Sequence, residues 1–166
     1  MNDAFEVSKV QLSDFDRTLP RKRVAAGVLF FDADGRVMLV DPVYKAPWEI
    51  PGGAVEWDES PRDGAAREVK EELGLVCAPG PLLGIDWVRP RPGRSEGMAA
   101  VFDGGVLGAE QVARIQLQAE EIRSFEFVGL EQIRELLVPL LARRVQACMA
   151  ARERGETVYL ENGVVV

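Results

Sequence analysis

One short segment, residues 51–75, constrains the fold more than any other because it specifies a loop and both ends of the helix that follows. Ser60 is a favourable N-cap, and Pro61 suits the first helical position, where a missing N–H removes no helical hydrogen bond. Gly74 is typical of the residue just beyond a helix, which adopts the left-handed conformation. The segment therefore predicts a helix from about Pro61 to Leu73, entered through a loop that contains two adjacent glycines.

The predicted helix carries an apolar stripe and, beside it, a cluster of carboxylates. The stripe consists of Ala65, Ala66, Val69 and Leu73. Glu68, Glu71 and Glu72 follow the spacing i, i+3, i+4 and lie together next to it. Like charges at this spacing destabilise a helix by about 0.2–0.5 kcal/mol per pair, and a bound cation would reverse that effect. Oxygen ligands without imidazole or thiolate suit a hard ion, Mg²⁺ or Mn²⁺. Taken alone, the charged run also fits a solvated helix face.

The spacing of the whole segment decides between these interpretations. Its defining positions are Gly53, Glu59, Arg67-Glu68-Val69, Glu71-Glu72 and Gly74-Leu75. This pattern resembles the complete Nudix box, and the flanking sequence resembles a Nudix domain from about Val24 to a helix beginning near Leu130. The resemblance implies an α/β fold with a mixed β-sheet sandwiched between α-helices. It also implies metal-dependent hydrolysis of a diphosphate linkage in a nucleoside diphosphate joined to another moiety, with release of a monophosphate.

The resemblance assigns expected roles to individual residues. The expected metal ligands are Glu68, Glu71, Glu72 and the carbonyl group of Gly52. Arg67 is expected to orient a carboxylate, with Glu59 and Glu71 as its partners. The general base is left open: the candidates are Glu71, Glu68 and the pair Glu120 and Glu121, which precedes a predicted strand, with Glu126 as a weaker candidate.

Substrate-binding groups are expected outside the box. Arg89, Arg91 and Arg94 stand on a proline-containing loop, where they either clamp phosphates bidentately or form an exposed charged loop. Trp48 either packs in the core or stacks on a base. The basic triplet at residues 21–23 either contacts phosphates or forms a solvated strand entry.

Composition excludes several classes of function. The 166 residues contain no histidine, so histidine-based triads, zinc sites and acid–base catalysis are ruled out. A net charge of −7 argues against nonspecific binding to nucleic acid or anionic membranes. No apolar stretch approaches the roughly 20 residues that span a bilayer. Cys77 and Cys148 lack metal-ligand spacing and are expected to be free thiols in the cytoplasm. The expected partner is a small phosphorylated molecule, a nucleotide derivative.

The organisation expected is a single domain over 1–166, with an N-terminal extension at 1–20, a core at 24–152 and a C-terminal hairpin at 156–166. Residues 1–20 fit either an extended lead-in or an added strand. Strands are expected at 24–31, 37–40, 76–83, 85–88, 98–102 and 124–128, with turns at 32–35 and 104–105. Segment 106–117 fits a strand or a short helix. A long helix from 130 to about 152 is expected to be kinked or interrupted at Pro139. The hairpin is expected to pair with a sheet edge, with a homodimer interface as one option.

A second class of function is a domain that binds or senses a nucleotide metabolite without hydrolysing it. Regulators of this kind commonly lose carboxylates of the box, whereas this chain retains all of them, which favours an enzyme. The sequence contains no marker that separates sugar nucleotides, nucleoside triphosphates, dinucleoside polyphosphates and other pyrophosphates as substrates.

Overall fold

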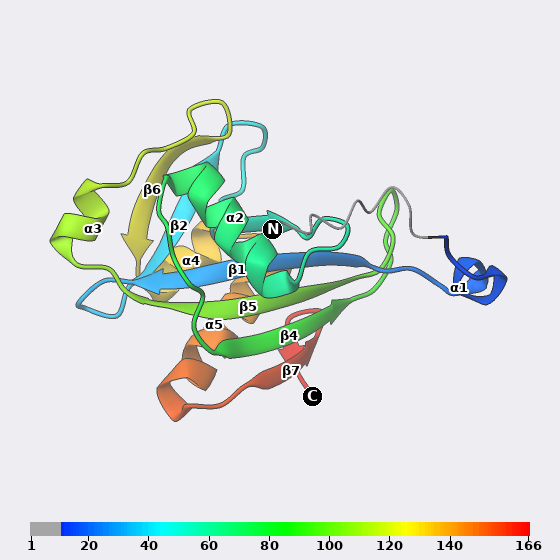
Figure 1. Cartoon of the computed structure of the whole chain (residues 1–166). Helices are drawn as coiled ribbons and strands as arrows, with labels where there is room; N and C mark the ends of the chain where they lie inside the picture. The colour runs from blue at the N-terminus through cyan, green and yellow to red at the C-terminus, as the bar shows by residue number, and fades with distance from the viewer. Residues whose placement is uncertain (1–10) are drawn as a thin grey trace.

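The structure, a computed structural model, describes residues 11–166 and contains one mixed β-sheet flanked by helices (Figure 1). The strands are β1 (Arg23–Phe31), β2 (Val37–Pro42), β3 (Gly52–Ala54), β4 (Leu82–Val88), β5 (Gly97–Val106), β6 (Ile122–Val128), β7 (Val158–Glu161) and β8 (Val164–Val165). The helices are α1 (Asp14–Thr18), α2 (Pro61–Leu73), α3 (Ala109–Ala113), α4 (Leu130–Leu136) and α5 (Pro139–Arg154). None of the helices in this part of the chain is long and apolar enough to cross a bilayer.

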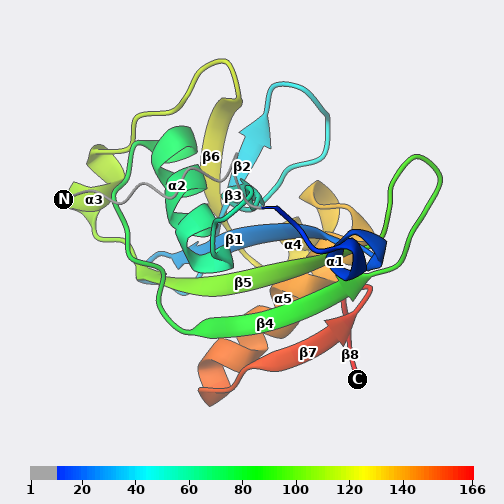
Figure 2. The same cartoon turned by 45° about the vertical axis from the view of Figure 1, so that its right-hand side comes forward.

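The strand order of the sheet is β6-β2-β1-β5-β4-β7-β8. The central strand β1 pairs in parallel with β5 along its whole length, from Arg23 opposite Gly97 to Phe31 opposite Val106. On its other edge, β1 pairs antiparallel with β2 at one end and with β3 at the other. Consequently the glycine loop, which contains β3, is held at the middle of the sheet rather than at its rim (Figure 2).

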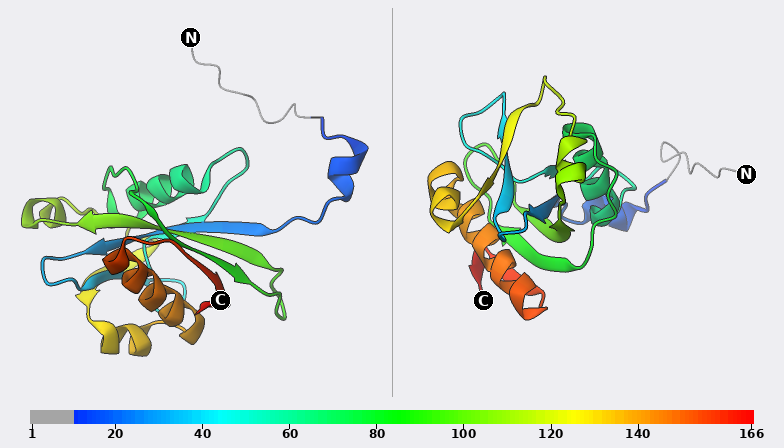
Figure 3. Two further views of the ribbon diagram at one scale, coloured as in Figure 1. Left: turned by 90° about the horizontal axis from the view of Figure 1, so that it is seen from below. Right: turned by 90° about the vertical axis from the view of Figure 1, so that its left-hand side faces the viewer.

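The two faces of β1 support two separate apolar clusters because successive side chains point to opposite sides of a strand. Val28 and Phe30 pack with α2, through Ala65, Val69 and Leu73. Leu29 and Phe31 pack with α4 and α5, through side chains such as Ile133, Leu141 and Val145. The sheet therefore lies between α2 on one face and α4 with α5 on the other, as the view along its edge shows (Figure 3). This arrangement confirms the predicted α/β class.

The predictions for the N-terminal segment were partly wrong. Residues 1–10 lie outside the described part of the chain, and residues 14–18 form helix α1 instead of a lead-in or a strand. Ser13 caps this helix by accepting a hydrogen bond from the N–H of Asp16 at 3.1 Å. The acidic residues Asp14 and Asp16 occupy the first turn, where the helix dipole favours them.

Two predictions between α2 and β6 need correction. Residues 76–81 form no strand, and β4 continues through Gly84 with an irregularity in its pairing to β5; a side chain at Gly84 would meet the sulfur of Cys148 on α5 at 2.9 Å. Gly104 and Gly105 do not end a strand, since β5 continues to Val106 with a bulge in its pairing to β1. Between Val106 and Leu117, where the sequence fits a strand or a short helix, the structure contains the short helix α3.

In the C-terminal third, two predictions agree with the structure. Pro139 interrupts the long helix, so that α4 ends at Leu136 and α5 begins at Pro139 itself. The strands β7 and β8 form a hairpin around Asn162 and Gly163, and β7 adds in parallel to β4 of the same chain.

Candidate active site

Helix α2 has the ends that its sequence specifies. The hydroxyl oxygen of Ser60 accepts a hydrogen bond from the N–H of Asp63 at 3.1 Å, and Gly74 closes the helix with φ of 67°. Ala65, Val69 and Leu73 are fully buried against the sheet. Because this stripe fixes the rotation of the helix about its axis, the neighbouring glutamates are presented to the glycine loop.

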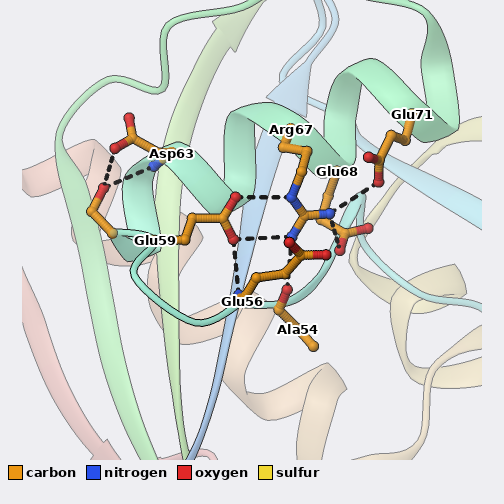
Figure 4. Close-up of polar contacts among 8 residues, drawn as sticks. Ala54, Glu56, Glu59, Asp63, Arg67, Glu68 and Glu71 are labelled. Carbon is orange, nitrogen blue, oxygen red and sulfur yellow. Dashed lines mark hydrogen bonds and ion pairs between the residues drawn. The ribbon is translucent and has the colours of Figure 1, made fainter. Parts of the chain in front are cut away.

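Arg67 is the centre of a network of carboxylates (Figure 4). Its Nε and a terminal nitrogen donate to the two oxygens of Glu59 at 2.8 and 3.0 Å. The other terminal nitrogen donates at 2.9 Å to both Glu68 and Glu71. A further bond, at 2.9 Å, reaches the carbonyl oxygen of Ala54 in the glycine loop. Both expected partners of Arg67 are thus present, and Glu68 and the loop are added to them.

The pKa values of Glu59 and Glu68 are shifted in opposite directions. Hydrogen bonds from Arg67 and from the N–H of Glu56 lower the pKa of Glu59. Burial raises the pKa of Glu68, although Arg67 opposes that shift. The same glutamates hold the pKa of Arg67 above its usual range. Arg67 therefore stays charged and acts as a fixed brace between the loop and the helix.

Glu72 is the most buried of the acidic side chains on α2, with a residue exposure of 7%. Burial raises its pKa to about 8, and the negative charges of Glu68 and Glu121 add to that shift. One hydrogen bond opposes it, donated to Glu72 by the N–H of Gly52 at 3.0 Å. Glu72 is therefore a buried carboxylate with a single protein donor, next to other carboxylates.

The glycine loop approaches α2 too closely for a side chain. A Cβ atom on Gly53 would lie 2.5 Å from the carboxyl carbon of Glu68. Gly52, with φ of 142°, would place a Cβ atom 2.3 Å from the carbonyl oxygen of Ala26 on β1. The two glycines are required because the loop backbone fills the space between β1 and the carboxylates of the helix.

The acidic residues before and in β6 lie at different places. Glu121 is exposed, and its negative charge contributes to the raised pKa of both Glu68 and Glu72, so it lies within electrostatic range of the α2 carboxylates. Glu120 is exposed in the same turn, and Glu126 is exposed within β6 opposite Leu39. Of these three candidates, Glu121 is the one that the structure brings to the site.

A hard divalent ion fits the chemistry of these groups. They are oxygen donors, and Glu72 is buried with one hydrogen bond, which leaves lone pairs for a cation. Within residues 11–166, however, no three acidic side chains already converge as a ready metal cage. Glu68 and Glu71 face the guanidinium group of Arg67 instead. The site thus contains the oxygen donors that a cation needs, but two of them, Glu68 and Glu71, are hydrogen-bonded to Arg67.

A cleft of about 970 Å³ adjoins the site and is lined by the loop from Gly52 to Trp57. Glu68, Glu71 and Glu72 do not line it themselves, but they contact its wall at Gly52 and Gly53. The opposite part of the lining comes from the start of β1, the end of β4, the β4–β5 turn and α5. Cleft and carboxylates meet at the glycine loop.

Only some of the residues predicted to bind substrate line the cleft. Arg91 and Arg94 line it, whereas Arg89 and Trp48 do not. The N–H of Arg89 donates to the side chain of Asn162 in the C-terminal turn, and Trp48 packs against the core cluster beneath α4 and α5.

Sequence reasoning missed several residues of the lining. Tyr44 and Trp57 are exposed aromatic side chains at the cleft, with Lys45 and Arg21 over their respective rings. Arg144 reaches the cleft from α5. The position of Trp57 inside the box loop was a usable signal, but Arg144 resembles any other arginine on an amphipathic helix.

The fold and the site together define a class: a layered α/β domain in which a glycine loop and an acidic helix meet a cleft of nucleotide size. Comparison with known proteins agrees. The profile of the NUDIX domain matches residues 21–148. The chain therefore belongs to the Nudix family of hydrolases.

Individual relatives show how far the similarity extends. The rat (Rattus norvegicus) diphosphoinositol polyphosphate phosphohydrolase 2 is 41% identical over 76 residues, 45% of this chain and 42% of that protein. The ADP-ribose pyrophosphatase of Methanocaldococcus jannaschii is 29% identical over 108 residues, 63% of this chain and 61% of that protein. The alignments span less than two thirds of either relative. The structure of a MutT protein from Methanosarcina mazei is similar with a TM-score of 0.65 and 26% identity, covering 84% of this chain and all of that one.

Proposed function

We propose that the protein is a pyrophosphohydrolase that uses Mg²⁺ or Mn²⁺ to cleave the diphosphate linkage of a nucleoside diphosphate joined to another moiety. The observation that carries this proposal is the contact between the acidic face of α2 and the cleft at Gly52 and Gly53. The names of two relatives, a diphosphoinositol polyphosphate phosphohydrolase and an ADP-ribose pyrophosphatase, support cleavage between phosphates.

Hydrolysis of a diphosphate requires that negative charge be neutralised and that water be aligned with the bond that breaks. Glu68, Glu71 and Glu72 would hold the metal, with the carbonyl group of Gly52 as a further ligand. When bound, a divalent ion polarises phosphoryl oxygens and lowers the pKa of coordinated water.

The residues of the chain have separate duties in this scheme. Arg67 keeps Glu59 and the glycine loop fixed relative to α2, so that the acidic groups stay in register with the cleft. Glu72 is fixed by the N–H of Gly52 and by burial. The general base is one of the exposed or half-buried carboxylates, Glu71, Glu68 or Glu121. The aromatic rings of Tyr44 and Trp57 offer stacking surfaces for a nucleobase at the mouth of the cleft.

The proposal is tested by a panel of sugar nucleotides, nucleoside triphosphates and dinucleoside polyphosphates, incubated with Mg²⁺ or Mn²⁺ in ¹⁸O-labelled water. A monophosphate product that carries the label at one phosphorus is expected. Substitution Glu72→Gln is expected to lower kcat by about two orders of magnitude or more while the thermal unfolding temperature stays near that of the wild type. Unchanged metal-dependent turnover in that variant would contradict the assignment, and ligand-induced stabilisation without any product would favour a binding domain.

Two further proposals concern the setting of the enzyme. The free thiols of Cys77 and Cys148 suit a reducing cytoplasm. Homodimerisation stays a prediction, and β7 of the C-terminal hairpin already pairs with β4 of its own chain.

A further inference from the structure

Three arginines from two separate segments come together on the wall of the cleft: Arg23 at the start of β1, and Arg91 and Arg94 in the β4–β5 turn. We propose that this arginine cluster binds phosphate groups on the half of the substrate that lies beyond the cleaved linkage. The substrate class is then a diphosphate whose distal half carries further phosphates. The substrate part of this inference rests on the proposed function, because the same cleft must hold the scissile linkage.

The β4–β5 turn presents two of the arginines side by side. Arg91 and Arg94 exchange backbone hydrogen bonds of 2.9 and 2.8 Å, with Pro92 and Gly93 between them. Gly93 has φ of 75°, which suits the second central position of a tight turn after proline. Residues directly opposite one another across such a turn project to the same side. The turn, which extends beyond the end of the sheet (Figure 2), thus places two arginine side chains on the same side of the hairpin.

Arg23 joins this pair from another strand. Its Nε and a terminal nitrogen both donate to the carbonyl oxygen of Ser95, at 3.2 and 2.7 Å. Desolvation lowers the pKa of Arg23, and the charges of Arg94 and Arg91 lower it further, so the three groups act on one another. The parallel pairing of β1 with β5 produces this proximity by setting Arg23 opposite Gly97, just after the turn.

Within the described part of the chain, the three arginines of the cluster have no carboxylate partner, unlike three of the other four cations that line the cleft; the fourth, Arg21, lies over the ring of Trp57. Lys22 pairs with Glu96, Lys45 with Glu49, and Arg144 with Asp86. None of the three arginines forms an ion pair with any acidic side chain in residues 11–166. This is unexpected in a chain whose net charge is −7 and which has 27 acidic residues. Mutual repulsion of fixed guanidinium groups destabilises the free protein and is relieved when an anion binds.

The chemistry of the cluster favours phosphate as that anion. Guanidinium groups bind phosphate oxygens through paired hydrogen bonds, and several groups held in one place suit a ligand with several phosphates. The cluster lies in the same cleft as Gly52 and Gly53, so a single small molecule can contact both. The volume of about 970 Å³ is sufficient for a ligand with two substantial halves.

Isothermal titration of the whole protein with inorganic tripolyphosphate, in EDTA and without metal, tests the cluster apart from catalysis. The test variant is Arg91→Ala/Arg94→Ala. The control is Arg114→Ala/Arg134→Ala, which removes the same charge from two exposed positions outside the cleft. The wild type and the control are expected to bind alike, within about twofold, and the test variant at least about tenfold more weakly. No binding to the wild type, equal binding to the test variant, or an equal loss in the control would overturn the site.

The substrate class is tested by kcat/KM for diadenosine pentaphosphate, which carries additional phosphates, and for ADP-ribose, which does not. In the test variant the ratio of the first value to the second is expected to fall at least about tenfold. An equal loss for both substrates would overturn the assignment of a phosphate-rich distal half. If no diphosphate is hydrolysed at all, the proposed function fails, while the titration still decides whether the cluster binds phosphate. Glu72→Gln, which is expected to lower kcat strongly, is expected to leave tripolyphosphate binding intact.

Discussion

At the scale of single residues, the active-site region depends on how closely the glycine loop approaches α2. Arg67 connects the two by donating hydrogen bonds to the carbonyl oxygen of Ala54 on the loop and to Glu68 on the helix. The N–H of Gly52 provides a second connection by donating a hydrogen bond to Glu72. These close approaches explain why the loop carries two glycines: a side chain at Gly53 would displace the carboxylate of Glu68, and a side chain at Gly52 would meet the backbone of β1.

Gly53→Ala is expected to reduce activity far more than stability. The new methyl group would lie 2.5 Å from the carboxylate of Glu68, which is the end of a flexible side chain and can move aside. A displacement of about 1 Å at a reacting centre lowers kcat by up to about 100-fold, whereas the free energy of unfolding should change by less than about 1 kcal/mol. Steady-state kinetics and urea unfolding measure the two effects.

The matched control is Gly129→Ala, since a Cβ atom on Gly129 meets nothing within 4 Å and the backbone there has φ of −86°. This control should retain wild-type kinetics. A Gly53→Ala enzyme with unchanged kcat would show that the position of Glu68 is not critical.

At the scale of secondary-structure elements, a buried ion pair ties the C-terminal hairpin to the cleft. Asp86 on β4 is fully buried and accepts a bond from Arg144 of α5 at 2.7 Å. Its second oxygen accepts from the N–H of Gly163 in the hairpin turn at 3.0 Å. One carboxylate thereby joins β4, α5 and the β7–β8 turn, and it holds the guanidinium group of Arg144, which lines the cleft.

Asp86→Ala is therefore expected to destabilise the protein by about 3 kcal/mol, because it leaves the largely buried guanidinium group of Arg144 unpaired. Glu156→Ala, which removes the exposed partner of Arg154, should cost less than about 1 kcal/mol. Urea unfolding followed by circular dichroism gives both values. Equal effects in the two variants would mean that the buried pair does not anchor the hairpin.

At the scale of the whole molecule, one sheet separates the two apolar clusters and supports the cleft from several distant segments. The buried thiol of Cys148, on the α5 side, reports on this packing because burial raises its pKa to about 12. An unfolded cysteine has a pKa of about 8.5. A raised pKa in the folded state gives stability that is complete below the unfolded value and is lost as the pH rises toward the folded value.

Between pH 9 and 11 the free energy of unfolding is accordingly expected to fall by about 1.4 kcal/mol per pH unit from this thiol alone. Cys148→Ala is expected to be less stable at neutral pH but to lack this part of the slope, so the slopes rather than the absolute values are compared. Chemical denaturation at several alkaline pH values provides the measurement. Parallel pH profiles of the two proteins would show that the thiol ionises without unfolding.

The elements that were predicted correctly are those with local determinants. The bounds of α2 follow from Ser60, Pro61 and Gly74, and the break before α5 follows from Pro139. The elements that were mispredicted depend on distant contacts. Gly84 and Gly104 read as turn residues in the sequence, yet both are strand residues whose missing side chains make room for Cys148 and Phe30. No local pattern contains that information.

The sequence by itself determined the family and the acidic helix, and it supplied the residues proposed for the hydrolysis, because the ends of a helix and the spacing of its side chains are encoded within a few neighbouring positions. Only the tertiary structure decided which basic residues reach the cleft. It excluded Arg89 from the lining and placed there Arg23, a member of the basic triplet that the sequence had left open and that is distant from Arg91 in the chain. The physical reason is the parallel pairing of β1 with β5, which brings the start of one strand beside the turn that precedes the other.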